Sequence, residues 1–151
     1  MKKLTATNGV IVLALAVAAE TAALACSCAA PGTAAESRVA AREAVRGAVA
    51  IVQVEVLAGY DQQRRRGEQL RVKRTLFGRA PATVELYRPS APSSAGCDLE
   101  LGRSQRRVLI LYPAPGGFFS GRRYRTQSLC SDYLTSPFYL PITLQEARRR
   151  R

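Results

Sequence analysis

The chain has 151 residues, including 23 lysines and arginines, 11 aspartates and glutamates and no histidine, and its formal net charge at pH 7 is +12. The absence of histidine excludes Ser-His-Asp and Cys-His catalysis and most zinc hydrolase sites. Because the acidic residues are also few and scattered, we expect a protein that is not an enzyme and that uses no cofactor.

The N-terminus has the three parts of a secretory signal peptide. Two lysines near the start are followed by an apolar run at residues 10–19, and Ala23 and Ala25 occupy the −3 and −1 positions of an A-x-A cleavage site. The apolar run is much shorter than the ~20 residues that a membrane-spanning helix needs. We therefore expect residues 1–25 to be removed on export to the periplasm or the extracellular space.

Cleavage after Ala25 would make Cys26 the first residue of a single exported domain, residues 26–151, which is long enough for a modest core. Two alternatives stay open for the N-terminus. The leading segment could remain as a membrane anchor or a buried helix. The sequence ALAC also resembles a bacterial lipoprotein cleavage box, with Ala23 where leucine is usual, and lipid anchoring at Cys26 would block its amine.

The four cysteines all lie in the expected exported domain, and an even number in an oxidising compartment predicts two disulfides. A Cys26–Cys28 bridge would be a strained ring. The two remaining pairings each join these cysteines to Cys97 and Cys130, and the residues alone do not choose between them. The Cys-x-Cys spacing, without a second close pair or any histidine, does not indicate a metal site of the protein's own.

Residues 34–46 are predicted to form a helix. Thr33 and Glu36 have the spacing of a capping box, in which each side chain accepts a hydrogen bond from a backbone N–H at the helix start. Val39 and Val45 give this helix only a thin apolar face, so we expect it to pack against a larger element.

Five short segments rich in β-branched and apolar residues predict strands, with turn-rich loops between them. The first has an apolar face at its even positions, whereas its other face changes from Val49 and Ile51 to Gln53 and Glu55. This strand should be buried on both faces at its start and half exposed at its end. The predicted strands are 48–57, 69–77, 82–88, 107–112 and 124–130, the last of which ends in Cys130.

Alternation of apolar and polar residues in the second and third strands predicts which side chains face the core. In the second strand these are Leu70, Val72 and Leu76, and in the third they are Val84 and Leu86. One helix and five short strands at this spacing predict a mainly β domain, either a small antiparallel barrel or a sandwich.

A solvated loop and a basic tail are predicted outside these elements. Residues 58–68 form a polar loop with a run of arginines at its tip. Residues 141–151 form a basic C-terminal tail, in which Thr143 and Glu146 have capping-box spacing before the terminal arginines. We expect the end of this tail to fray.

Several segments together resemble the tissue inhibitors of metalloproteinases and, more broadly, the netrin-like modules. They are CSC at the predicted mature N-terminus, the helix after it, AVAIVQVEV, LRVKRTLFG, CDLELGRSQRRVLILY and SLCSDYL. The resemblance covers most of residues 26–151 and implies a small five-stranded OB-fold-like barrel with one packed α-helix. With only four cysteines, the chain resembles a short bacterial-type form of the family. The pairings that the resemblance implies are Cys26–Cys97 and Cys28–Cys130.

The resemblance also implies a function, inhibition of a zinc metalloendopeptidase. In such inhibitors the α-amino group and the carbonyl oxygen of the first cysteine, here Cys26, chelate the catalytic zinc of the target and displace the attacking water. The next residue, Ser27, would enter the specificity pocket of the target, and Cys28 and Ala29 would continue the contact surface. The expected partner is therefore a zinc metallopeptidase, bound by a monomer that holds no metal of its own.

The positive charge leaves a second function open. Nucleic-acid binding could explain the excess of arginine, but the aromatic residues are not interleaved with the basic runs as stacking platforms require. Export would also separate the protein from cytoplasmic nucleic acid, so we expect no nucleic-acid partner. The alternative function is a non-inhibitory netrin-like binding module whose arginine-rich surface contacts anionic lipid or polysaccharide.

Overall fold

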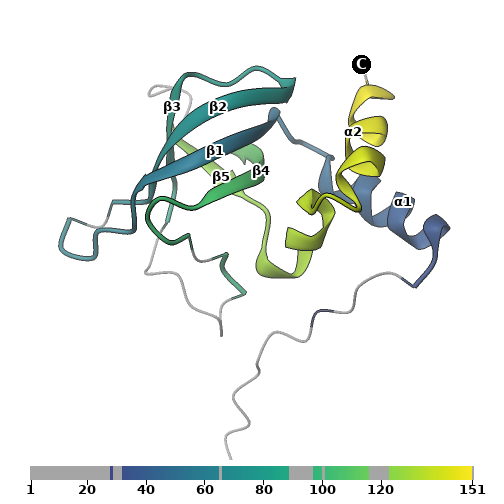
Figure 1. The fold of residues 1–151 in the computed structure, drawn as a ribbon, viewed down its shortest axis with the longest axis horizontal. Coiled ribbons are helices and arrows are strands. Elements are labelled where there is room, and N and C mark those ends of the chain that lie inside the picture. Colours follow the sequence, from purple (N-terminus) through teal and green to yellow (C-terminus); the bar gives the residue numbers. More distant parts are fainter. Residues whose placement is uncertain are drawn as a thin grey trace, which may run out of the picture.

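A computed structural model describes residues 28, 32–64, 66–88, 97–99, 101–115 and 123–150 of the chain. The predicted signal peptide, residues 1–25, lies outside the described residues. In Figure 1 the strands form a barrel on one side of the molecule, and both α-helices lie together on the other side.

The five strands close into a small barrel in the order β1-β2-β3-β5-β4. Every neighbouring pair is antiparallel except β3 and β5, which run parallel. This closed five-stranded arrangement confirms the predicted OB-fold-like barrel, in which each strand has a neighbour on both sides. The strands are β1 (Ala50–Ala58), β2 (Gln69–Gly78), β3 (Thr83–Leu86), β4 (Arg106–Pro113) and β5 (Arg123–Thr126).

Two hydrophobic clusters lie on the two sides of β1, as its sequence pattern predicts. The even-numbered residues face the barrel interior, where the predicted Leu70, Val72, Val84 and Leu86 also lie. Ile51 points to the other side and packs in a second cluster between the barrel and the helices. Farther along this outer face Gln53 is exposed and Glu55 is half-buried. The buried residues of the interior are Ala50, Val52, Val54, Val56, Leu70, Val84, Leu86, Leu99, Leu101, Leu109 and Leu111.

The prediction that Leu76 faces the barrel interior is wrong, because β2 is irregular. Ile51 pairs with Phe77, whereas the next residue, Val52, pairs with Thr75, so Leu76 is an extra residue in the β2 strand. Such a bulge breaks the two-residue alternation of a strand. Leu76 and Phe77 therefore pack against the second cluster, on the helix side of the barrel.

Helix α1 (Ala34–Ala44) begins at the predicted capping box. The Thr33 hydroxyl accepts from the Glu36 backbone N–H at 3.1 Å, and the Glu36 carboxylate accepts from the Thr33 N–H at 2.9 Å. The helix ends earlier than the predicted residue 46. Its buried face contains Ala41 and is continued by Val45, the C-cap residue, whereas Val39 is 59% exposed. Of the two valines expected to make the apolar face, only Val45 does so.

The fifth strand is shorter than predicted, and Cys130 does not lie in it. Strand β5 ends at Thr126, and a 3₁₀ helix, η1 (Leu129–Thr135), follows and carries Cys130. The side chain of Gln127 explains the change, because its Oε1 accepts a hydrogen bond from the Ile110 backbone N–H of β4 at 2.8 Å. This side-chain bond replaces a backbone hydrogen bond that would continue the β4–β5 pairing. The backbone after Thr126 can therefore turn into η1.

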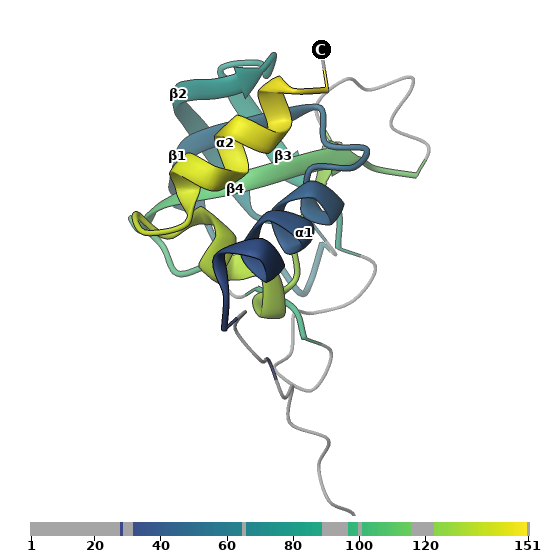
Figure 2. The ribbon, with the colours of Figure 1, turned by 90° about the vertical axis from the view of Figure 1, so that its right-hand side faces the viewer.

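The predicted C-terminal tail is a second packed helix, α2 (Leu140–Arg148), which lies beside α1 in Figure 2. The predicted capping box is wrong because the helix begins before Thr143. The Thr143 hydroxyl is buried and donates to the Leu134 carbonyl at 2.8 Å. Glu146 and Ala147 are also buried, so packing holds this segment in the helix as far as residue 148, where fraying had been expected.

Candidate functional site

A disulfide joins Cys28 to Cys130, across a sequence separation of 102 residues, with the two Cα atoms 4.8 Å apart. It is the pairing that the family resemblance implies for these two residues. Cys28 is exposed and Cys130 is half-buried. The bond therefore attaches the chain near its predicted mature N-terminus to helix η1.

Of the other two cysteines, Cys97 lies among the described residues. Cys97 is also disulfide-bonded, and its carbonyl accepts a hydrogen bond from the Leu129 N–H at 2.9 Å. Residues 97 and 130, which the resemblance assigns to the two N-terminal cysteines, thus lie at the same end of the barrel. Cys26, Ser27 and Ala29 lie outside the described residues, so the Cys26–Cys97 pairing and the roles of these three residues stay predictions.

Helix η1 is fixed against strand β4 by side chains that form a buried network. Beyond its bond to β4, the buried Gln127 accepts from the Thr126 hydroxyl at 2.6 Å and donates to the Thr135 hydroxyl at 3.4 Å. Arg107 of β4 adds an ion pair to Asp132 of η1 at 2.8 Å. These contacts give the Cys28–Cys130 disulfide a rigid support on the barrel.

A buried ion pair supports the segment that carries Cys97. Glu68 and Arg88 are almost fully buried, and Arg88 also donates to the Leu99 carbonyl at 2.6 Å and lies 3.6 Å from the Asp98 carboxylate. Arg88 therefore ties residues 97–99 to the barrel. The prediction of a solvated loop at 58–68 is wrong at its last two residues, because Gly67 and Glu68 are buried.

The close approach of residue 67 to strand β3 explains why Glu68 is buried. A Cβ atom at Gly67 would lie 1.5 Å from the Leu86 carbonyl oxygen, so only glycine fits there. The next residue then pairs with β3, since the Leu86 N–H donates to the Glu68 carbonyl at 3.0 Å. The sequence signal for this contact was the Gly-Glu pair directly before an apolar strand, with an arginine, Arg88, at the end of the predicted third strand.

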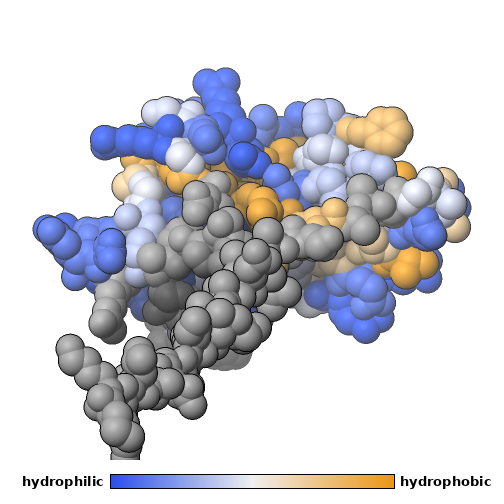
Figure 3. All heavy atoms as spheres, turned by 90° about the horizontal axis from the view of Figure 1, so that it is seen from below, coloured by the Kyte–Doolittle hydropathy of each residue, from blue (hydrophilic) through white to orange (hydrophobic). Residues whose placement is uncertain are grey.

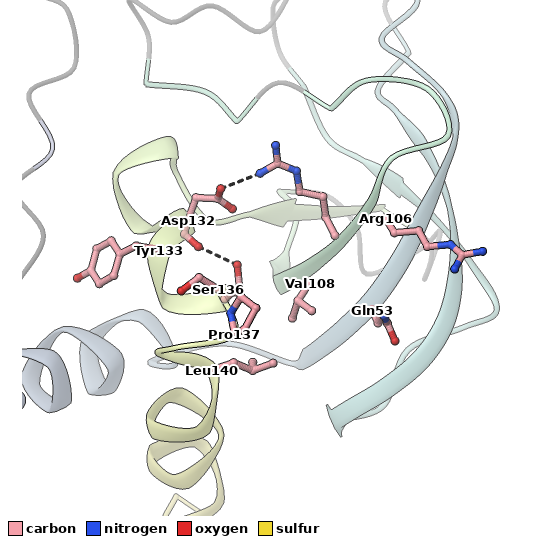
Figure 4. Close-up of a pocket in the computed structure, with 10 residues that line it drawn as sticks. Gln53, Arg106, Val108, Asp132, Tyr133, Ser136, Pro137 and Leu140 are labelled. Atoms are coloured by element: carbon pink, nitrogen blue, oxygen red, sulfur yellow. Dashed lines mark hydrogen bonds and ion pairs between the residues drawn. The ribbon is translucent and has the colours of Figure 1, made fainter.

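A pocket of about 440 Å³ lies between β4, η1 and the start of α2 (Figure 4). Val108 of β4 and Leu140 of α2 line it, together with Arg107 and Asp132, which form an ion pair. Beside it, Phe138 is 79% exposed and its ring contacts that of Tyr139. Burial raises the pKa of the neighbouring Tyr133 hydroxyl, and interaction with Tyr139 adds to the shift.

Seen from the side on which η1 lies, hydrophilic side chains project around the edges of the described surface, with smaller hydrophobic patches between them (Figure 3). Among the described residues, no group of three or more cysteine, aspartate or glutamate side chains could hold a metal ion. None of the helices in the described ranges has the length and apolar character to cross a membrane.

No protein-family model matches the chain, and no curated protein sequence matches it.

Proposed function

We propose that the protein inhibits a zinc metallopeptidase through its N-terminal cysteine, without enzymatic activity of its own. The observation that supports this proposal most directly is the Cys28–Cys130 disulfide, next to a second disulfide-bonded cysteine, Cys97. The Leu129–Cys97 backbone hydrogen bond holds these two attachment points together. A chelating N-terminus needs such a rigid attachment, because ordering a free terminus on binding would cost entropy.

The chemistry of the proposed inhibition uses the backbone of Cys26. An α-amino group has an ordinary pKa of about 7.7–8.0, so part of it is unprotonated at neutral pH. Its nitrogen and the carbonyl oxygen of the same residue form a five-membered chelate ring on Zn²⁺, which accepts both N and O ligands. Ser27 would occupy the specificity pocket of the target, and Cys28 and Ala29 would line the contact surface beside it.

The chelation proposal requires export, cleavage before Cys26 and a free amine. Disulfide bonding of Cys28, Cys97 and Cys130 supports an oxidising compartment. Intact-mass analysis of the exported protein should give the mass of residues 26–151 less four hydrogens, for two disulfides. An added diacylglycerol mass would identify a lipid anchor instead and would exclude the free amine.

The decisive experiment is an alanine added before Cys26 in the secreted protein. This extension moves the α-amino group away from the chelating position, so inhibition of a sensitive zinc metallopeptidase should be abolished while the unfolding temperature is unchanged. The matched control is one alanine added after Arg151, which should inhibit like the unmodified protein. Equal inhibition by the two extended proteins would show that the amine is not the zinc ligand.

The alternative is a non-inhibitory netrin-like binding module that uses an arginine-rich surface on an anionic partner. A specific cluster of arginines at the ends of α1 and α2 favours this second activity, and it is independent of zinc chelation. The cluster lies at the ends of the two α-helices, whereas the Cys28–Cys130 disulfide lies at η1, so anion binding and zinc chelation can be tested separately.

A further inference from the structure

Four arginines gather where the C-terminal ends of α1 and α2 meet. Arg42 lies in the last turn of α1 and Arg46 directly follows its C-cap, whereas Arg149 and Arg150 directly follow α2. With Glu146 they line a hollow of about 370 Å³, which we call the arginine hollow. Nothing in the inhibitor proposal uses these residues.

A buried carboxylate fixes two of the four guanidinium groups. The Glu146 side chain is 3% exposed, and its two oxygens lie 3.4 Å from Arg42 Nε and 3.1 Å from Arg149 Nη1. Because Glu146 is held in the packed interface of the helices, both arginines are oriented before any ligand arrives. Such preorganisation lowers the entropy cost of binding.

The other two arginines are held at the rim of the hollow. Arg46 Nη2 donates to Glu43 Oε1 at 2.7 Å, and Arg150 Nη1 donates to the Val45 carbonyl. Within the described ranges, each of the four guanidinium groups thus makes hydrogen bonds through one nitrogen only. A guanidinium group has five N–H donors, so most donors around the hollow remain for a ligand.

The charge balance in the hollow favours an anion with two negative charges. Four guanidinium groups face two carboxylates, those of Glu146 and Glu43, which leaves an excess of two positive charges. The C-terminal end of a helix carries partial negative charge that would oppose an anion. At the end of α1, however, the Ala44 carbonyl already accepts from the Tyr112 hydroxyl and the Val45 carbonyl from Arg150.

We propose that the arginine hollow binds a phosphate monoester group. A monoester carries about −1.5 to −2 charges at pH 7 and three acceptor oxygens, which fits the excess of two positive charges. Its oxygens accept paired hydrogen bonds from guanidinium groups that approach from several directions, whereas a planar carboxylate has one negative charge and suits a single guanidinium. The ester belongs either to a soluble compound or to a lipid headgroup, and the test separates these sources.

Binding is measured first with glycerol 3-phosphate by isothermal titration calorimetry, and then by sedimentation with phosphatidylcholine vesicles that contain phosphatidic acid or phosphatidylglycerol. Arg46→Gln should weaken binding about tenfold, as expected for the loss of a charge-assisted hydrogen bond. Glu43→Gln should strengthen it, because Arg46 then loses its carboxylate partner. The matched control is Arg74→Gln, at an exposed arginine in β2, which should bind like the unmodified protein.

Both the Arg46–Glu43 pair and Arg74 are exposed, so these substitutions should leave the unfolding temperature unchanged. Saturable binding of glycerol 3-phosphate assigns a soluble ligand, and binding restricted to phosphatidic acid vesicles assigns a lipid headgroup. Equal losses for Arg46→Gln and Arg74→Gln would mean general charge attraction and would overturn the proposal. It would also be overturned by equal binding to phosphatidic acid and phosphatidylglycerol, or by no binding to any probe.

Discussion

Arg88 and Glu68 form a two-point ion pair next to strand β3, with Nε–Oε2 and Nη2–Oε1 distances of 3.0 and 3.1 Å. Their side chains are 8% and 1% exposed. Twenty residues separate them in the chain, and the pair joins the residue before β2 to the second residue after β3. Because Arg88 also binds the Leu99 carbonyl, the same contact positions the segment of Cys97.

Removing one member of this pair should destabilise the protein more than removing both. Arg88→Met leaves the Glu68 carboxylate buried without its partner, so the free energy of unfolding should fall by about 3–5 kcal/mol. The double variant Glu68→Gln/Arg88→Met removes both charges and should lose less. Urea unfolding followed by circular dichroism measures both values, and a double variant at least as unstable as Arg88→Met would contradict the expectation.

Gly67→Ala should be strongly destabilising, because the added Cβ would lie 1.5 Å from the Leu86 carbonyl oxygen. The backbone must shift to relieve this overlap, at an expected cost of about 3 kcal/mol or more in unfolding free energy. Gly59→Ala is the matched control, since a Cβ there meets no atom within 4 Å. Thermal unfolding of both variants tests the contact, and similar melting temperatures would show that residue 67 does not approach β3 this closely.

The Cys28→Ala/Cys130→Ala variant should separate stability from inhibition. The barrel strands are joined by their own hydrogen bonds and by two hydrophobic clusters, so the far-ultraviolet circular dichroism spectrum should be retained. The unfolding free energy should fall by about 2–5 kcal/mol, which is typical for the loss of a native disulfide. If the chelation proposal holds, inhibition should be lost in the folded variant, and full inhibition would contradict the need for this tether.

The capping box of α1 should make stability depend on pH. Hydrogen bonds from Thr33 and Gly32 lower the pKa of the Glu36 carboxyl below its usual value of 4.5, so the ionised form favours the folded state. This contribution is present above pH 4.5 and is lost as the pH falls through the lowered pKa of the folded state. Glu36→Gln should therefore be less stable than the unmodified protein at pH 7, and the difference should shrink in acid.

Thermal unfolding from pH 7 to pH 2.5 measures this dependence. Glu43→Gln serves as the control, since Glu43 is an exposed glutamate later in the same helix and lies outside the capping box. A stability difference between Glu36→Gln and the unmodified protein that stays constant over the whole pH range would rule out the proposed role of the ionised carboxylate.

Local patterns in the sequence were sufficient to predict the features that depend on residues close together in the chain. The capping box at Thr33 and Glu36 and the alternating apolar face of β1 are confirmed. The capping box depends on two residues three positions apart, and the apolar face depends on alternation within a single strand. The number and spacing of such strands predicted either a barrel or a sandwich, and the structure has the barrel.

Contacts between distant segments decided the rest. The bulge that moves Leu76 out of the barrel depends on the pairing of β2 with β1, and Cys130 leaves the last strand because Gln127 binds β4. Glu68 is buried only because Gly67 lies against Leu86 and Arg88 lies within reach.

The sequence alone determined one helix with its cap, the apolar faces of the main strands, and an excess of arginine over acidic residues. Only the tertiary structure decided that residues 140–148 form a packed helix, that Cys28 is bonded to Cys130, and that four arginines surround one buried glutamate. The physical reason is that periodicity and caps act over one or two turns, whereas burial and charge pairing depend on which distant residues the closed barrel brings together.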